Sequence, residues 1–212
     1  MSSKGIALVT GAAQGIGRAI TLRLADDDFD VAVNDISVSE DLQSLVKEIQ
    51  QRGRASSIHA ADVSQDAQVK QMIEAVVQKH GSLDVMVANA GVVGPPGMEI
   101  TDVTVEEWDR VMNVNARGAF LSYKYAGLQM VKQGRGGRII GASSLAGKQG
   151  HSTQVPYTAS KFAVRGLTQS AGITVNAYAP GVIETPMNIA DFVSFIASKE
   201  SKFITGQTDV RY

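Results

Sequence analysis

The sequence contains no cysteine, and its 212 residues include only three histidines, His59, His80 and His151. The absence of cysteine excludes disulfides, thiolate chemistry and metal sites with cysteine ligands. Because the histidines lie far apart in the chain, we predict no metal site. No apolar run is long enough to span a membrane, so we predict no membrane partner. The amino terminus, MSSKGIALVT, lacks the apolar stretch of a secretory signal, and we therefore expect a cytoplasmic protein.

Charged residues of either sign are also few, at 19% of the chain. Lysine and arginine number 20, and aspartate and glutamate number 21, which gives a formal net charge of -1. This balance offers no electrostatic reason to expect nucleic acid or an anionic membrane as a partner. The apolar fraction of 44% is that of an ordinary globular domain, and the length suits a single domain over residues 1–212.

Short apolar runs alternate with helical patterns along the chain. Apolar residues at helical spacing lie between the runs and predict helices at 16–25, 42–49, 69–77, within 105–131, from 157 and from 188. The runs themselves predict strands at 5–9, 31–33, 56–60, 83–88, 138–142 and 173–178. Strands that alternate with helices form a parallel sheet with right-handed crossovers, so the fold class is α/β.

The first motif that carries chemistry is TGAAQGIG, residues 10–17. It follows the first predicted strand and opens the first predicted helix. Gly11, Gly15 and Gly17 let the backbone turn tightly and approach a pyrophosphate, which the helix amino terminus would then bind. Glycines also make ordinary turns, and the spacing is G-x-x-x-G-x-G rather than the usual G-x-G-x-x-G. The strand-turn-helix context favours nucleotide binding.

Asp35 ends the second predicted strand, in DVAVND. An acidic residue at this distance from the glycines can accept both hydroxyls of the adenosine ribose and would repel a 2′-phosphate. No lysine or arginine lies at 12–14 or 36–39 to attract such a phosphate. We therefore predict NAD(H) rather than NADP(H); the alternative is that Asp35 is a solvent-exposed residue at a strand end.

Tyr157 and Lys161, in YTASK, lie four positions apart and would share one face of a helix. A nearby ammonium favours the phenolate and lowers the pKa of a tyrosine. Tyr157 is thus a candidate general acid and base near neutral pH. The same spacing is common on helix surfaces, so this motif alone is weak.

Seven motifs in order resemble the classical short-chain dehydrogenase/reductase family, and the resemblance extends from residue 5 to about residue 187. It implies a Rossmann-type doubly wound parallel sheet, an oxidoreductase with a nicotinamide dinucleotide, and a homo-oligomer, either tetramer or dimer. Residues 1–142 would mainly hold the cofactor, and residues 143–212 would supply catalysis and the substrate site. The motifs are TGAAQGIG at 10–17, Asp62-Val63, ANAG at 88–91, NVNARG at 113–118, ASS at 142–144, YTASK at 157–161 and PGVIETPM at 180–187.

The resemblance also implies roles for individual residues. Tyr157 would give or take the proton of the substrate hydroxyl, and Lys161 would lower the pKa of Tyr157 and hold the nicotinamide ribose. Ser144 would hydrogen-bond the substrate oxygen, and Asn115 would anchor a water relay that ends at Lys161. The residues implied to bind the cofactor are Gly11, Gln14, Gly15, Ile16, Gly17, Asp35, Asp62, Val63, Asn89, Ala90, Gly91, Tyr157, Lys161, Pro180, Gly181, Val182, Ile183 and Thr185.

Longer stretches are similar to the acetoin and diacetyl reductases, which are 2,3-butanediol dehydrogenases. These stretches include GIALVTGAAQGIGRAI, SKFAVRGLTQSA and GITVNAYAPG. The resemblance implies a small hydroxyketone as the substrate. The 3-oxoacyl carrier-protein reductases and the sugar dehydrogenases share many of the same motifs, so these substrates are alternatives.

Three segments of the family pattern are shorter here. The helix that carries LTQSA normally continues for two or three more turns, whereas Ala171-Gly172 leads directly into a strand. From Tyr157 to Ala171 the helix would span about 22 Å, which still crosses a strand, and Gly172 could terminate it. The few dozen residues of the substrate lid after ETPM are missing, and FITGQTDVRY lacks the VDGG-like ending of the family.

Two explanations of these short segments are open. The sequence could hold only the ordered residues of a longer enzyme with a mobile lid, or the segments could be deleted. In the second case, the chain would be a nucleotide-binding protein with little turnover. We favour the first explanation, because all three losses fall in the C-terminal third and each ends at a motif.

Overall fold

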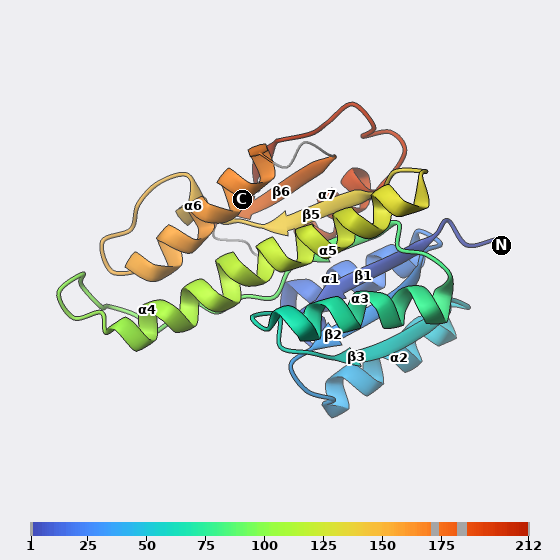
Figure 1. Ribbon diagram of the computed structural model, residues 1–212, viewed down its shortest axis with the longest axis horizontal. Coiled ribbons are helices and arrows are strands. Elements are labelled where there is room, and N and C mark those ends of the chain that lie inside the picture. Colours follow the sequence, from blue (N-terminus) through green and yellow to red (C-terminus); the bar gives the residue numbers. More distant parts are fainter. Residues whose placement is uncertain (1, 171–173, 182–185, 212) are drawn as a thin grey trace.

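A parallel sheet of seven strands forms the centre of the computed structural model, which describes residues 2–170, 174–181 and 186–211 (Figure 1). The strand order is β3-β2-β1-β4-β5-β6-β7, and every neighbouring pair is parallel. This order reverses direction between β1 and β4, as in a doubly wound nucleotide-binding sheet. The strands are β1 (Ile6–Thr10), β2 (Asp30–Asp35), β3 (Ser56–Ala60), β4 (Val85–Ala88), β5 (Arg138–Ala142), β6 (Val175–Pro180) and β7 (Thr208–Arg211).

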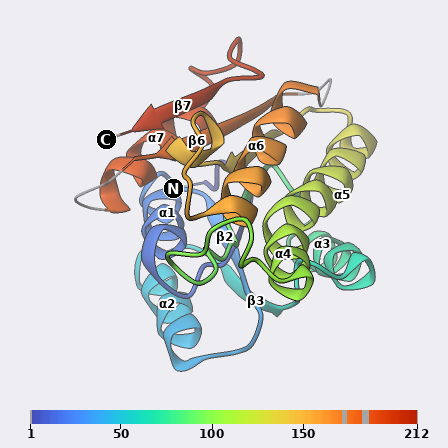
Figure 2. The same cartoon turned by 90° about the vertical axis from the view of Figure 1, so that its left-hand side faces the viewer.

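Helices cover both faces of the sheet (Figure 2). One face carries α1 (Gly15–Asp26), α2 (Glu40–Gln51) and α7 (Pro186–Ala197). The other carries α3 (Asp66–His80), α5 (Gly118–Gln133) and α6 (Val155–Ser170). A π-helical segment, Asn113–Arg117, joins α4 (Val105–Met112) to α5, and this run extends beyond the carboxyl ends of the strands (Figure 1). A short 3₁₀ turn, Leu145–Gly147, follows β5.

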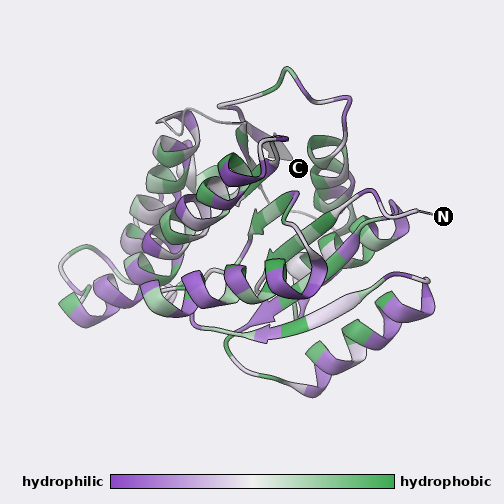
Figure 3. Cartoon of the chain, turned by 45° about the vertical axis from the view of Figure 1, so that its right-hand side comes forward, coloured by the Kyte–Doolittle hydropathy of each residue, from purple (hydrophilic) through white to green (hydrophobic). Residues whose placement is uncertain are grey.

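The sheet separates two apolar cores, and β1 shows how the sequence builds both. Its side chains alternate between the two faces, as the two-residue period of a strand requires. Ala7 and Val9 pack with α1, α2 and α7, whereas Ile6 and Leu8 pack with α3 and α5. Helix α2 buries Leu42, Leu45 and Ile49 against the sheet, and polar residues cover its outer face (Figure 3). A strand buried on both faces must be apolar throughout, which explains the uninterrupted run in β1.

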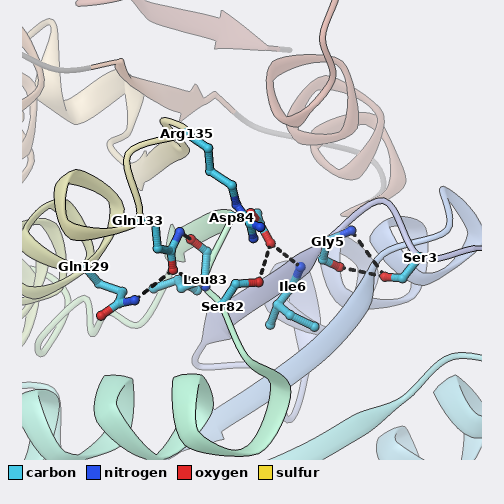
Figure 4. A network of polar contacts seen from close by, with 9 residues as sticks. All are labelled: Ser3, Gly5, Ile6, Ser82, Leu83, Asp84, Gln129, Gln133 and Arg135. Carbon is cyan, nitrogen blue, oxygen red and sulfur yellow. Dashed lines mark hydrogen bonds and ion pairs between the residues drawn. The ribbon is translucent and has the colours of Figure 1, made fainter.

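Polar contacts fasten the amino ends of the central strands (Figure 4). The Oδ2 atom of Asp84 accepts hydrogen bonds from the Ile6 N–H at 2.8 Å and from the Ser82 hydroxyl at 2.9 Å. The side chain of Gln133 accepts from the Leu83 N–H at 2.8 Å and donates to its C=O at 3.0 Å. Protein side chains thereby satisfy these backbone groups at the amino edge of the sheet.

The predicted α/β fold with a doubly wound parallel sheet is confirmed, and β3 and β5 have the predicted bounds. The predicted strand at 173–178 is wrong by two residues, because the register with β5 pairs Ile139 with Val175. The short strand β7 was not predicted from its largely polar residues; its backbone pairs with β6. The shortened α6 ends at Ser170 and still packs against β5 and β6, while Gly172 lies outside the described residues. Within the described ranges, no helix combines the length and apolar character that a membrane crossing requires.

Candidate active site

A cavity of about 570 Å³ lies at the carboxyl edge of the sheet, where the strand order reverses between β1 and β4. Open α/β sheets bind ligands at this place because the loops on either side of the reversal diverge. The residues that line it are Gly11, Gln14, Ile16, Gly17, Asn34, Asp35, Ile36, Ala61, Asp62, Val63, Asn89, Ala90, Gly91, Val92, Val93, Val114, Ala142, Ser143, Ser144, Tyr157, Lys161, Tyr178, Pro180 and Gly181.

The glycine-rich turn between β1 and α1 forms the floor of the cavity. Gly11 has φ +62°, a left-handed conformation that favours glycine. At Gly17, an added Cβ would collide with the carbonyl oxygen of Gly11 and lie 2.6 Å from Nδ2 of Asn89. Glycines therefore keep this turn compact, and a ligand can approach its backbone closely.

The amino terminus of α1 is open, unlike those of two other helices. Ser39 caps α2 by accepting from the Leu42 N–H, and Thr104 caps α4 by accepting from the Glu107 N–H. Both of those helices also carry carboxylates in their first turn. At α1, Gln14 makes no side-chain cap, and the first turn has no acidic residue. Its N–H groups are thus available to an anion such as a pyrophosphate.

Asp35 lies at one end of the cavity, beside the glycine-rich turn. Its Oδ2 atom accepts from the Ala13 N–H at 3.1 Å, and its Oδ1 atom accepts from the Ile36 N–H at 2.9 Å. The carboxylate is therefore held in place beside the glycine-rich turn. Arg18, the first cation of α1, forms an ion pair with Glu48 and does not line the cavity.

The loop after β3 forms a second wall of this end. The Oδ1 atom of Asp62 accepts from the Ser64 N–H at 2.9 Å and from its hydroxyl at 2.8 Å. Val63 is buried against the start of α5, where a Cβ at Gly118 would lie 2.9 Å from its Cγ2 atom. Both motif residues therefore lie where a ligand in the cavity can contact them.

At the other end, Lys161 and Tyr157 project from α6 towards Ser144 at the end of β5. The ammonium of Lys161 donates to the Ala142 C=O at 2.7 Å and lies 5.4 Å from the centroid of the Tyr157 ring. Lys161 is 5% exposed, and this burial lowers its pKa to about 8. A carbonyl placed between Ser144 and Tyr157 would meet two hydroxyl groups, and a cation lies behind them.

The pKa of Tyr157 corrects one prediction. Burial raises it above its ordinary value, and a hydrogen bond with Ser144 opposes this rise without reversing it. Burial therefore outweighs the predicted lowering of the Tyr157 pKa in this structure, where the Lys161 ammonium lies over the ring and donates to the Ala142 C=O. In this arrangement Tyr157 is a protonated phenol at neutral pH, which can donate a proton.

Asn115 lies in the π-helical segment, behind the cavity wall rather than in it. Its Oδ1 atom accepts from the Val92 N–H at 2.8 Å, and its Nδ2 atom donates to the Val92 C=O at 2.8 Å and to the Ser160 hydroxyl at 3.0 Å. Ser160 in turn donates to the Tyr157 C=O at 2.7 Å. Asn115 therefore connects the loop after β4 to the helix that carries Tyr157. The predicted water relay through Asn115 stays a prediction.

The structure brings most of the predicted residues to one cavity. Two do not line it: Asn115, as described above, and Gly15, whose φ of +55° serves the turn. Val182, Ile183 and Thr185 lie outside the described residues. Sequence reasoning missed Ile36 and Tyr178, among others, because neither belongs to a recognised motif. Ile36 follows Asp35 directly, and this position was the available signal.

A cluster of three or more histidine, cysteine, aspartate or glutamate side chains could hold a metal ion. The part of the chain that the structure describes contains no such cluster.

Comparisons with known proteins agree with this geometry. The family model described as short chain dehydrogenase matches residues 5–192. A short-chain dehydrogenase/reductase of Armillaria gallica is 48% identical, with 96% of this chain and 92% of the relative covered. The 3-oxoacyl-[acyl-carrier-protein] reductase FabG of Staphylococcus aureus (strain N315) is 40% identical, with 95% and 94% covered.

Among solved structures, a short-chain type dehydrogenase/reductase from Mycobacterium marinum is 31% identical, with a TM-score of 0.92 and coverage of 98% of this chain and 93% of that chain. Levodione reductase also has a TM-score of 0.92, at 26% identity, with 99% and 96% covered. The alignment with the Armillaria relative extends over 243 residues, more than this chain contains. That relative therefore has internal residues with no counterpart here.

Proposed function

Since this chain belongs to the short chain dehydrogenase family, we propose that it is an NAD(H)-dependent oxidoreductase that interconverts a small ketone and a secondary alcohol. The observation that carries the proposal is the single cavity with Asp35 at one end and Ser144, Tyr157 and Lys161 at the other. The first can bind a ribose, and the other three can bind a carbonyl and supply a proton. The glycine-rich turn between them suits the pyrophosphate of a dinucleotide.

The residues of the cavity fit NAD(H) better than NADP(H). Asp35 presents a fixed carboxylate, which accepts hydroxyl groups and repels a phosphate. Among the described residues that line the cavity, Lys161 is the one lysine, and no arginine is present. Because Lys161 lies at the catalytic end, no cation lines the end where a 2′-phosphate would bind. When bound, the nicotinamide would supply or accept the hydride.

The protein residues would orient the carbonyl and move one proton. The Ser144 hydroxyl would donate a hydrogen bond to the substrate oxygen and hold it beside Tyr157. In ketone reduction, Tyr157 would transfer its phenolic proton to that oxygen, and in alcohol oxidation it would accept the proton back. The charge of Lys161 would stabilise the phenolate between these steps. Asn115 would hold the wall of the cavity through the backbone of Val92.

For the substrate we propose acetoin, diacetyl or butanediol. The resemblance of GITVNAYAPG and the neighbouring stretches to acetoin and diacetyl reductases supports this choice. The cavity also supports an uncharged substrate, because Val92 and Val93 line it close to the catalytic end. A 3-oxoacyl thioester is the second candidate, since the relatives include 3-oxoacyl-[acyl-carrier-protein] reductases at 40% identity. Turnover of NADH with an acetoacetyl thioester, and none with diacetyl or acetoin, would establish the second candidate.

The proposed activity is tested with Tyr157→Phe. We expect this variant to lose turnover of diacetyl by at least about a hundredfold, because it removes the proton donor. Binding of NADH, measured by fluorescence titration, should change little. Tyr125→Phe is the matched control, since Tyr125 lies on α5 and hydrogen-bonds Asp66 away from the cavity. It should keep full activity.

The same titration tests the cofactor. The wild-type protein should bind NADH more tightly than NADPH, because Asp35 repels the 2′-phosphate. Tighter binding of NADPH would contradict the assignment to NAD. Binding of NADH without turnover of any ketone, and no effect of Tyr157→Phe, would instead indicate a nucleotide-binding protein with little activity.

We also propose that the chain assembles as a homodimer or homotetramer. Apolar side chains of α5 and α6 remain exposed in the single chain, including Phe120, Leu128 and Phe162. A face of this kind is a common site of association between copies. Light scattering of the purified protein measures the assembly, and a monomer at micromolar concentration would contradict this proposal.

A further inference from the structure

Tyr178 lines the cavity from β6, although no recognised motif assigns it a role. Its side chain is 1% exposed, and its backbone C=O accepts from the Ser143 N–H at 2.8 Å. Burial raises the pKa of its hydroxyl, so this group stays protonated and acts as a donor. The donor lies 2.6 Å from the Oδ1 atom of Asn89.

Asn89 connects Tyr178 to the glycine-rich turn. Its Nδ2 atom donates to the Thr10 C=O at 2.9 Å and to the Gly11 C=O at 3.1 Å. An amide that uses both donor directions on one side must present its oxygen on the other side. The Tyr178 hydroxyl meets the oxygen there. Without this hydroxyl, Oδ1 would lose that hydrogen bond, and the amide would gain freedom to rotate.

The glycine-rich turn is packed so closely against Asn89 that a rotation of the amide would disturb it. A Cβ at Gly17 would lie 2.6 Å from Nδ2 of Asn89, and one at Gly11 would lie 3.1 Å from the same atom. A side chain at either glycine would therefore crowd the Asn89 amide. Movement of the amide would move the backbone that faces the cavity.

These contacts cross the sheet at its carboxyl edge. Tyr178 belongs to β6, Asn89 follows β4, and Thr10 ends β1, while β5 lies between β4 and β6. Two strand spacings, about 10 Å, separate β6 from β4, and a tyrosine is among the few side chains long enough to bridge most of that distance. The hydroxyl therefore connects the half of the sheet against which α6 packs to the half that is followed by the glycine-rich turn.

We propose that Tyr178 is a positioning residue for the cofactor. Tyr178 acts through Asn89 to hold the backbone of the glycine-rich turn in its binding conformation. Tyr178 does not itself take part in proton transfer. The inference rests on the proposed function, because it requires that the cavity binds NAD(H).

The test compares two tyrosine-to-phenylalanine variants. Tyr178→Phe should raise the Kd and KM for NADH about tenfold, which corresponds to the loss of one buried hydrogen bond. Its kcat at saturating NADH should stay within about twofold of the wild-type value, since the proton donor is untouched. Tyr123→Phe is the matched control: Tyr123 is also buried, and its hydroxyl bonds Thr168 in the core on the other face of the sheet. It should leave the Kd for NADH unchanged, although both variants should lower Tm.

A double-mutant cycle assigns the effect to Asn89. Asn89→Ala should weaken NADH binding, and adding Tyr178→Phe in that background should weaken it no further. An unchanged Kd for Tyr178→Phe in the otherwise wild-type protein would overturn the inference, as would a loss of the same size in both backgrounds. If the wild-type protein binds no NADH, the proposed function fails and the inference fails with it. Binding by the wild type and by Tyr178→Phe with equal Kd overturns the inference alone.

Discussion

Lys161 carries a charge in a place that disfavours one. It is almost fully buried, and the only hydrogen bond of its ammonium among the described residues is to the Ala142 C=O. Burial penalises the charged form, so the pKa falls from an ordinary 10.5 to about 8. The ammonium is therefore charged at neutral pH and becomes neutral within the range that an enzyme assay can reach.

The pH profile of ketone reduction should record this change. Below pH 8 Lys161 is charged and Tyr157 is protonated, so the rate should be constant. Above pH 8 Lys161 loses its proton, and the charge that stabilises the phenolate disappears. We therefore expect kcat/KM for diacetyl reduction to fall along an alkaline limb with a midpoint near pH 8.

The variant Lys161→Arg tests whether Lys161 causes the alkaline limb, because arginine stays charged throughout the assay range. If this variant retains activity, its alkaline limb should move above pH 10. Lys132→Arg, on an exposed residue at the end of α5, is the control and should leave the profile unchanged. A wild-type rate that stays constant to pH 10 would contradict the assignment.

At the scale of single elements, the sequence predicted what local patterns determine. The alternation of apolar runs and helical spacing located β1 to β6 and α1 to α7, because each element buries a face whose period is visible in the chain. The π-helical segment at Asn113–Arg117 was not predicted, since the apolar spacing of 105–131 continues through it. Its consequence is the inward position of Asn115, which depends on one extra residue per turn.

The contacts of Tyr178 and Ser160 could not be predicted for a different reason. A motif is recognised from its local spacing, whereas the partners of these two side chains depend on which strands and helices become neighbours. Tyr178 reaches Asn89 across β5, and Ser160 meets Asn115 between α6 and the π-helical segment. Sequence separation alone does not give these distances. The motifs of the candidate site could therefore be identified from the sequence, and the contacts that support them could not.

Substitutions at two helical glycines test whether the glycine-rich turn needs to be free of side chains to bind NADH. Gly17→Ala should weaken NADH binding at least about tenfold and lower Tm, because the new Cβ would collide with the Gly11 carbonyl. Gly166→Ala is the matched control at an exposed position of α6, where an added Cβ meets nothing within 4 Å. It should raise the free energy of unfolding by about 0.5–1 kcal/mol, since alanine is the better helix former. Equal NADH affinity for Gly17→Ala and the wild type would show that the turn tolerates a side chain.

At the scale of the whole molecule, we expect acid stability to depend on a pair of partly buried histidines outside the cavity. The Ser57 hydroxyl lies 2.8 Å from Nε2 of His59 and 2.8 Å from Nε2 of His80. One hydroxyl can donate to one neutral ring and accept from the other. Burial first, and then the charges of His80 and Lys79, lower the pKa of His59 from 6.5 to about 4. Both histidines are thus held neutral in the folded state.

The sign of the effect follows from this lowered pKa. Between pH 6.5 and about 4 the unfolded chain binds a proton at His59 that the folded chain does not, so stability falls as the pH falls through this window. We expect Tm of the wild type to drop more steeply from pH 7 to pH 4.5 than Tm of His59→Gln. His151→Gln, on an exposed loop residue, should follow the wild-type curve. Parallel curves for all three proteins would exclude His59 as the cause.

The strand order also determines at which stage of folding the cavity can form. Pairing of β1 with β2 joins nearby segments, whereas pairing of β1 with β4 brings together residues such as Ile6 and Asp84, 78 positions apart. Closing the longer loop costs more entropy, and pairings of this range slow folding. The cavity lies over that second junction. A nascent chain therefore has no complete cavity until β4 has been synthesised and docked, and a ligand of the cavity can stabilise only a sheet whose two halves have already met.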